Sequence, residues 1–459
     1  MNKLIYLFFA LLLFISSCKK DKKPDDINNT ENLLTDPATG WKRVAVIPFD
    51  ELKTARGTSP YNRMKGFDLQ KVGGQFAVLY AQHSLDLNNR LASDWFFKAL
   101  VTENATVQPE KINFGAFSSS GSGNPGPYGK YTFYAQFLPG NSTPVFTGVE
   151  YTNNHTVLVD QTSKVIAGTP SRISTFGYLP DGEFLAGTTP LNGSETHLWH
   201  YKNPPNPLGD FNYTYRPSTI DGNKRLFTIP IKGADGNYYE FALCSKNGAN
   251  TFMVIRCRED RPYGATPPNY EVVDSGPLSG MPQSGLSADS LIPLTYEYNS
   301  TTGELTFVFE DYLRIPTEVD NRYKNIYAYR WKQGLLTKLW QTSAIESDGV
   351  LQAALTTYSN VNRLNDWRLK ADGTLYLMDV VQSNSPQNGD AALKLWEVNG
   401  SGIKVISSVT HGQTVQKEYT ISTCRYIDGA YYALAFPTGD SKYSIGDPHY
   451  HMELIKLNP

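Results

Sequence analysis

Apolar and polar positions alternate in short runs along most of this chain, and residues 364–380 (LNDWRLKADGTLYLMDV) show the pattern most clearly. Two strand-like runs flank the turn Ala371-Asp372-Gly373. Asp-Gly between two such runs is a strong hairpin signal, because the tight turn needs a positive φ that glycine adopts without steric cost. Two more runs follow at residues 393–398 and 402–407. The pattern therefore predicts a meander of four antiparallel strands.

Six further copies of this pattern occur along the chain. In each copy, two runs surround a turn that contains glycine, and a third run with a large apolar centre comes after a loop. The copies occupy residues 64–101, 130–160, 173–201, 225–257, 291–341 and 421–457. The turn glycines recur at intervals of 42 to 70 residues and are Gly74, Gly140, Gly182, Gly236, Gly303, Gly373 and Gly429. The copy around Gly140 is the faintest.

Composition agrees with a large fold built from strands. The 459 residues include 29 Tyr, 22 Phe, 37 Gly and 28 Pro, and 19% of the residues are charged. This composition is typical of an all-β protein with a sizeable core. Regular four-strand units at this spacing resemble the blades of a β-propeller. A pair of β-sandwiches is the alternative, since sandwiches also contain many short strands.

The two ends of the repeated region favour the propeller. The last copy stops at Leu457 without a fourth strand, while residues 41–49 (WKRVAVIPF) form a strand-like run before the first copy. A propeller closes its ring when one terminus completes the blade of the other, which removes a sheet edge. The sequence therefore predicts an all-β fold of seven four-stranded blades closed by an N-terminal strand. Six or eight blades are the alternatives, because the second copy is faint.

The connections between the runs are unequal in length. In a propeller the glycine turns lie on one face, and the second-to-third and fourth-to-inner connections lie on the other. The long connections predicted for that second face are residues 82–93, 117–129, 258–289, 311–325, 341–363, 381–391, 408–419 and 437–450. Long loops on a rigid scaffold often carry binding residues, so the second face is the predicted binding face.

Candidate ligand-binding residues are the cationic and aromatic side chains of these loops: His83, Arg90, Arg314, Arg322, Tyr323, His411, Tyr443 and His449. Aromatic faces beside charged groups suit a sugar or a peptide. Asp366, Glu310 and Asp379 could act as acid or base residues on inner strands, although nothing in the sequence pairs them. There is no nucleophile elbow, zinc-protease motif or P-loop, so no catalytic residue is assigned and neither metal nor cofactor is expected.

The first residues of the chain are not part of the predicted fold. Residues 1–17 combine one charge, an apolar run and small residues, which describes a secretory signal peptide. Ile15-Ser16-Ser17-Cys18 resembles the bacterial lipobox, in which the cysteine is lipidated and becomes the new N-terminus. An ordinary signal peptide is the alternative. Residues 18–40 are too polar to fold alone and predict a flexible tether, and residues 41–459 are the single propeller domain.

Three cysteines lie within the predicted propeller: Cys244, Cys257 and Cys424. In an oxidising compartment an odd number leaves one of them free or paired between molecules. A turn centred near residues 247–249 would place Cys244 opposite Met253 rather than opposite Cys257. The sequence therefore favours buried thiols over a disulfide bond.

Charge and organisation together limit the function. The net charge is −2, and no basic face of the kind that binds nucleic acid is evident. Residues 19–26 resemble the surface-export signal of Bacteroidota lipoproteins, and the whole chain resembles propeller lipoproteins of that phylum in organisation. The resemblance implies a lipid-anchored (palmitate-bearing) outer-membrane protein, exposed at the cell surface or in the periplasm. It would bind a glycan, a peptide or a protein. The alternatives are a propeller-type polysaccharide hydrolase or lyase, and a scaffold subunit of an outer-membrane complex.

Overall fold

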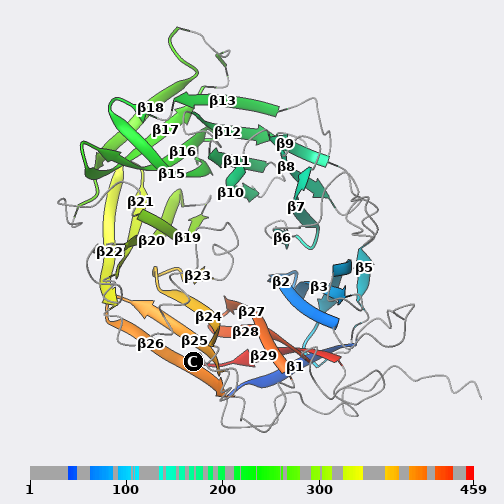
Figure 1. Cartoon of the computed structure of the whole chain (residues 1–459). Helices are drawn as coiled ribbons and strands as arrows, with labels where there is room; N and C mark the ends of the chain where they lie inside the picture. The colour runs from blue at the N-terminus through cyan, green and yellow to red at the C-terminus, as the bar shows by residue number, and fades with distance from the viewer. Residues whose placement is uncertain are drawn as a thin grey trace, which may run out of the picture.

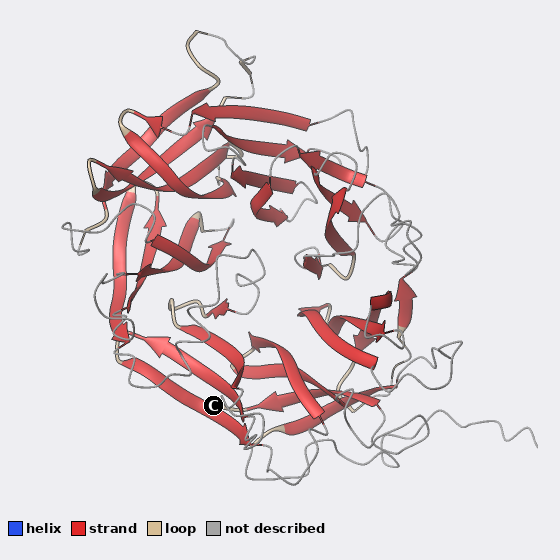
Figure 2. Ribbon diagram, in the orientation of Figure 1, coloured by secondary structure: helices blue, strands red, loops and turns tan. Residues whose placement is uncertain are grey.

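The computed structural model arranges the chain as a ring of antiparallel β-sheets around a common centre (Figure 1). The structure describes residues 40–48, 62–85, 91–104, 107, 109–112, 134–137, 141–150, 155–160, 165–169, 172–178, 184–189, 195–201, 211–217, 219–233, 235–258, 260–261, 266–279, 291–299, 302–312, 324–344, 367–381, 392–410, 419–437 and 451–459. Regular structure in these ranges is strand (Figure 2), and none of them contains a helix long and apolar enough to cross a membrane.

Hydrogen bonding groups the described strands into seven sheets of neighbouring antiparallel strands. The first sheet in chain order holds β2 (Asn62–Val72), β3 (Gln75–Leu85), β4 (Leu91–Val101) and β5 (Glu110–Ile112). The second holds β6 (Tyr134–Phe137), β7 (Pro144–Glu150), β8 (His155–Asp160) and β9 (Val165–Thr169). The third holds β10 (Arg172–Tyr178), β11 (Phe184–Thr189), β12 (Glu195–Tyr201) and β13 (Phe211–Pro217).

The remaining sheets follow the same order along the chain. The fourth holds β14 (Thr219–Ile220), β15 (Asn223–Lys232), β16 (Tyr238–Lys246), β17 (Ala249–Cys257) and β18 (Tyr270–Pro277). The fifth holds β19 (Leu291–Asn299), β20 (Glu304–Tyr312), β21 (Lys324–Lys332) and β22 (Leu335–Ala344). The sixth holds β23 (Trp367–Leu369), β24 (Leu375–Val381), β25 (Ala392–Asn399) and β26 (Gly402–Thr410).

The seventh sheet joins the two ends of the described chain. It holds β27 (Tyr419–Ile427), β28 (Ala430–Pro437) and β29 (His451–Leu457), and its outermost strand is β1 (Lys42–Pro48). β1 runs antiparallel to β29, with Lys42 opposite Lys456 and Pro48 opposite His451. The predicted pairing of the N-terminal strand with the last unit is therefore confirmed.

The first strands of the sheets lie at the centre of the ring and touch one another (Figure 1). β27 contacts β2 and β23, β2 contacts β6, and β15 contacts β10 and β19. β19 is the edge strand of its sheet, so Pro293 is tolerated there. β14 pairs with β15 only at Asn223 and Lys224, so the inner edge of β15 is unpaired at Pro230 as well. The arrangement is propeller-like.

Each first strand turns back into the second strand on the same face of the ring, which we call the glycine-turn face. The described turns carry Gly74, Gly236, Gly303, Gly373 and Gly429, and all five have positive φ. Position 373 requires glycine for two reasons: its φ is positive, and a Cβ there would lie 2.7 Å from Cδ1 of Leu339. Five predicted turn glycines are thus confirmed, whereas Gly140 and Gly182 lie outside the described residues.

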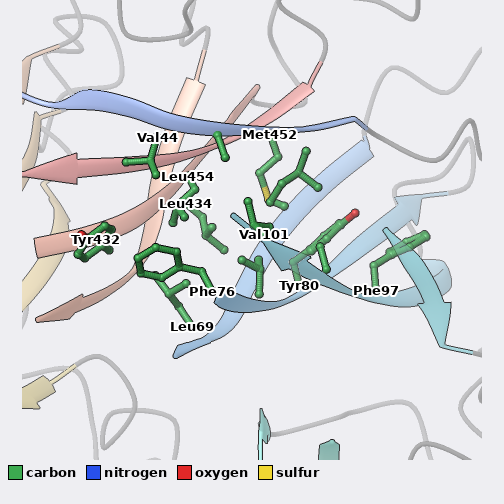
Figure 3. Close-up of a cluster of buried hydrophobic side chains, with 14 of the residues drawn as sticks. Val44, Leu69, Phe76, Tyr80, Phe97, Val101, Tyr432, Leu434, Met452 and Leu454 are labelled. Atoms are coloured by element: carbon green, nitrogen blue, oxygen red, sulfur yellow. The ribbon is translucent and has the colours of Figure 1, made fainter. Parts of the chain in front are cut away.

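Buried side chains fill the space between neighbouring sheets. Figure 3 shows one such cluster, in which β1, β28 and β29 pack against β2, β3 and β4; its members include Val44, Leu69, Phe76, Tyr80, Val101, Tyr432, Leu434, Met452 and Leu454. Between the fourth and fifth sheets the filling is aromatic, with ring centroids 4.8 Å apart for Phe241 and Phe307. Burial of each such side chain is worth about 1.5–3 kcal/mol, so the sheets are held together mainly by their faces.

Three sequence predictions need correction. Residues 258–289 are not one loop, because β18 lies within them as the outer strand of its sheet. Residues 82–93 are mostly strand, since β3 continues to Leu85 and β4 begins at Leu91. Cys244 lies opposite Thr251 and not Met253, because Asn247 and Gly248 form a two-residue turn with positive φ at both positions.

The expected burial of the three propeller cysteines is confirmed, since Cys244, Cys257 and Cys424 are all buried. Burial raises the pKa of Cys244 and of Cys424 to about 12. Because the thiolate is the reactive form, residues 36–459 should react very slowly with a thiol reagent at pH 8 and should expose three thiols in guanidinium chloride. Fast stoichiometric labelling of the native protein would contradict this burial.

Candidate functional site

The face opposite the glycine turns, which we call the loop-bearing face, is where second strands end and third strands begin. His83 is the one predicted ligand-binding residue within the described ranges, and it lies on β3 opposite Arg63 of β2 and Asp94 of β4. The other predicted residues lie outside those ranges: Arg90, Arg314, Arg322, Tyr323, His411, Tyr443 and His449. Cys18 lies outside them as well. These assignments stay predictions.

The candidate acid or base residues are not on first strands. Glu310 lies on β20 and Asp379 on β24, which are the second strands of their sheets. Glu310 is opposite Ile292 and Ile326 in the sheet. Asp366 lies outside the described residues. Inner-strand positions for Glu310 and Asp379 are therefore wrong, because each residue comes after the glycine turn of its unit and so lies on the second strand.

A carboxylate missed by the sequence analysis lies at the ring centre. Asp68 of β2 is almost completely buried and follows a β-bulge between Gly66 and Asp68. One carboxylate oxygen lies 2.5 Å from a guanidinium nitrogen of Arg425 on β27, and the other accepts the backbone N–H of Phe137 on β6 at 2.8 Å. Asp68 thus joins the first strands of three sheets. Because its oxygens are engaged, the geometry favours a structural role over a catalytic one.

We expect Asp68→Asn to lower the free energy of unfolding by about 2 kcal/mol, because charge-assisted bonds to Arg425 and Phe137 weaken. The matched control is Asp428→Asn, whose carboxylate also lies 2.5 Å from a cation on a neighbouring sheet, Lys71, but is 63% exposed. An exposed pair is worth less than about 1 kcal/mol. Urea unfolding of both variants measures the difference. Equal losses of unfolding free energy in the two variants would show that the bonds of Asp68 do not hold the three first strands together.

A second buried polar group stands at the loop-bearing end of β29. Nε2 of His451 lies 3.0 Å from a carboxylate oxygen of Glu453, which also lies 3.5 Å from the guanidinium of Arg43 on β1. His451 and Glu453 are 3% and 0% exposed. Among the described residues, Nδ1 of His451 has no hydrogen-bond partner. The group therefore fixes the start of β29 next to the predicted binding loop 437–450, but its burial keeps it from acting on a ligand directly.

A third polar group joins the sixth and seventh sheets near the glycine-turn face. Nζ of Lys370 lies 4.4 Å from the ring centroid of Tyr426 and 2.5 Å from a carboxylate oxygen of Glu397. The hydroxyl of Tyr431 donates to the same oxygen at 2.6 Å. Burial favours a higher pKa for Glu397, but these two hydrogen bonds outweigh it and lower the pKa. An aromatic and acidic cage of this kind can bind a cation, and here Lys370 of the chain itself fills it.

No sequence motif predicts these buried polar groups, but a charged residue within an apolar strand is one signal that could have indicated them. Glu453 interrupts the largely apolar strand β29, and a charge in such a position is usually paired. Asp68 lies in a strand with several other polar residues and gives no such signal. Within the ranges that the structure describes, no three His, Cys, Asp or Glu side chains are placed to hold a metal ion. The described polar groups thus support the scaffold, and the binding residues predicted for the loop-bearing face stay predictions.

The sequence matches no protein-family model and no curated protein sequence. Among solved structures the chain is similar to the polysaccharide lyase Uly1, at 9% identity and a TM-score of 0.40 over 92% of this chain and 97% of that one. It is also similar to the β-propeller domain of the Trilobed protease from Pyrococcus furiosus, at 11% identity and a TM-score of 0.41 over 83% and 91%. A further similarity is to Trypanosoma rangeli sialidase, at 11% identity and a TM-score of 0.31 over 91% and 59%. These similarities are too distant to carry an argument about activity.

Proposed function

We propose that this chain is a lipid-anchored, seven-bladed propeller of the bacterial envelope that binds a glycan, peptide or protein through its loop-bearing face. The observation that carries the proposal is the difference between the two faces. First and second strands are joined by tight glycine turns, such as Gly73-Gly74 and Asp428-Gly429. On the other face, β20 ends at Tyr312 and β21 begins at Lys324, while β28 ends at Pro437 and β29 begins at His451.

The seven-bladed count is supported by seven hydrogen-bonded sheets and by β1, which completes the sheet of β27, β28 and β29. In this proposal each sheet is one blade, and β14 is a two-residue addition to the fourth. Attachment to the membrane is supported by the lipobox-like sequence that ends at Cys18 and by the polar tether after it. The Bacteroidota resemblance of residues 19–26 favours the outer membrane and the cell surface.

The ligand class follows from the side chains predicted for the loop-bearing face. Arg314, Arg322 and Tyr323 lie between β20 and β21 in the sequence, and Tyr443 and His449 lie between β28 and β29. Arginine and histidine can fix hydroxyl or carboxylate groups, while tyrosine supplies flat apolar area for a sugar ring or a peptide side chain. A binding site of this type would require no cofactor.

A glycan array and an envelope pull-down with residues 36–459 test the proposal. We expect saturable binding to at least one glycan or protein, lost in Arg322→Ala and Tyr323→Ala. The matched control is Thr302→Ala, an exposed residue in the β19–β20 turn on the opposite face of the same sheet. Binding that survives both loop variants but is lost in the control would place the ligand on the glycine-turn face. Turnover of a bound polysaccharide would instead identify a propeller hydrolase or lyase.

A further inference from the structure

The cage around Lys370 is built by four strands at their glycine-turn ends. Lys370 directly follows β23, and Glu397 lies on β25. Tyr426 of β27 and Tyr431 of β28 lie opposite each other, and their rings meet at 60° with centroids 5.0 Å apart. Nζ of Lys370 lies 4.4 Å from the centroid of Tyr426 and 5.1 Å from that of Tyr431. With Oε2 of Glu397 at 2.5 Å, two aromatic faces and one carboxylate surround a single ammonium group.

The walls of this cage are held by contacts that do not involve Lys370. The hydroxyl of Tyr431 donates to the Glu397 carboxylate at 2.6 Å. The backbone N–H of Tyr426 donates to the hydroxyl of Tyr376 on β24. The ring of Tyr376 stands edge-on to that of Tyr431, at 5.3 Å and 79°, and both residues are buried. The walls would therefore keep their places if the lysine withdrew, and a preformed site loses little free energy to ordering when a ligand binds.

The side chain of Lys370 is the replaceable part of the cage. It is 15% exposed and the side chain of Glu397 is 20% exposed, so the cage reaches the surface. The backbone N–H of Lys370 bonds to the carbonyl of Thr374 at 2.7 Å, and its carbonyl accepts the N–H of Gly373 at 2.9 Å. The four-carbon stem of a lysine is flexible. Rotation of the stem alone would thus bring the ammonium group into water while β23 and its turn stay folded.

We propose that the cage binds the ammonium group of an external ligand, either an alkylammonium or a quaternary ammonium, and that Lys370 occupies it as an intramolecular competitor. The faces of the two tyrosine rings attract a cation, and Glu397 supplies the opposite charge. The apparent affinity for the ligand is reduced by the fraction of molecules in which the lysine fills the cage. The cage lies at the glycine-turn face, so its ligand is independent of the one proposed for the loop-bearing face.

Chemical labelling of residues 36–459 tests the competition in the native chain. Lysines are reductively methylated with formaldehyde and cyanoborohydride, and mass spectrometry measures the rates at Lys370 and Lys332. Lys332 is the matched control, because it also pairs with a carboxylate, that of Glu304 at 3.0 Å, but is 47% exposed. We expect tetramethylammonium chloride to raise the rate at Lys370 several-fold over sodium chloride at the same concentration, with no change at Lys332. Equal rates at Lys370 in the two salts would overturn the competition.

Thermal unfolding of Lys370→Ala tests the emptied cage. We expect tetramethylammonium to raise the melting temperature of this variant above its value in sodium chloride, and Glu397→Gln in the same chain to abolish the rise. An equal rise with ethylammonium would identify a lysine-like ligand, and a smaller one a quaternary ligand. Lys332→Ala is the matched control and should show no rise. No rise in Lys370→Ala, or the same rise in both single variants, would overturn the site. The labelling needs no variant and decides the question if Lys370→Ala does not fold.

Discussion

Removal of strand β1 is expected to abolish cooperative folding of the ring. A chain that begins at residue 49 loses Val44, Ala45 and Ile47 from the cluster in Figure 3, where they are 8%, 0% and 0% exposed. It also loses Trp41 from the core between the sixth and seventh sheets. The apolar contribution of these side chains is on the order of 5 to 10 kcal/mol. That amount is comparable with the 5 to 15 kcal/mol by which a typical domain is stable.

Hydrogen bonding adds to the expected loss. β29 would become an exposed sheet edge, because β1 supplies its outer partner from Lys42 to Pro48. β1 also holds the next sheet in the ring, since its Val44 carbonyl accepts the N–H of Asn104, which follows β4. One strand therefore contacts two sheets. Its removal should open the ring at that junction and favour aggregation through the unpaired edge.

Size-exclusion chromatography and thermal unfolding of residues 49–459 measure the effect, with residues 36–459 as the control that lacks the same signal and most of the tether. We expect the control to be monodisperse with a sharp transition and the shorter chain to aggregate or melt without one. Addition of a synthetic peptide of residues 40–48 should restore part of the transition. An unchanged melting curve for residues 49–459 would show that β1 does not close the ring.

Point variants leave β1 in the chain and measure how much its individual side chains contribute to stability. Ile47→Ala removes a fully buried side chain and should cost about 2 to 5 kcal/mol. Lys42→Ala changes an exposed residue of the same strand and should stay within about 0.5 kcal/mol. Similar losses for both would mean that backbone pairing with β29, rather than burial, holds the strand in place.

The sequence predicts the strands that have strong local signals. Asp428-Gly429 and its equivalents mark the hairpins, because positive φ is an intrinsic demand of the turn. Residues 41–49 read as a strand because four consecutive positions of β1, Val44 to Ile47, are buried on both faces. Signals of this kind are local, so a single sequence is enough to find them.

Outer strands and inter-sheet contacts are harder to predict. β18 is half-exposed along its whole length and ends in Gly276-Pro277, so its sequence lacks the apolar run that marks a buried strand. The contact of Asp68 with Arg425 joins residues that are 357 positions apart in the chain. The pairing register also shifts after Gly66 in β2 and after Pro293 in β19, and both strands lie at the ring centre. No local pattern encodes such distant partners.

A buried ion pair in the fourth sheet should give the largest effect of any single polar substitution. A guanidinium nitrogen of Arg225 on β15 lies 2.6 Å from a carboxylate oxygen of Glu240 on β16, and the two side chains are 1% and 3% exposed. Glu240→Leu leaves the arginine charge without its carboxylate in a site closed to water. Such a loss costs about 3 to 5 kcal/mol. We therefore expect a large fall in the urea midpoint of this variant.

A double variant shows whether the loss in Glu240→Leu comes from the unpaired arginine charge or from other contacts of Glu240. Arg225→Met with Glu240→Leu removes both charges and keeps most of the volume, so it should be more stable than Glu240→Leu alone and close to the parent protein. The matched control is Glu304→Leu, which breaks an exposed cross-strand pair with Lys332 at 3.0 Å and should cost less than about 1 kcal/mol. If the double variant were as unstable as the single one, the carboxylate of Glu240 would stabilise the sheet through contacts other than Arg225. The ion pair would then not be the source of the loss.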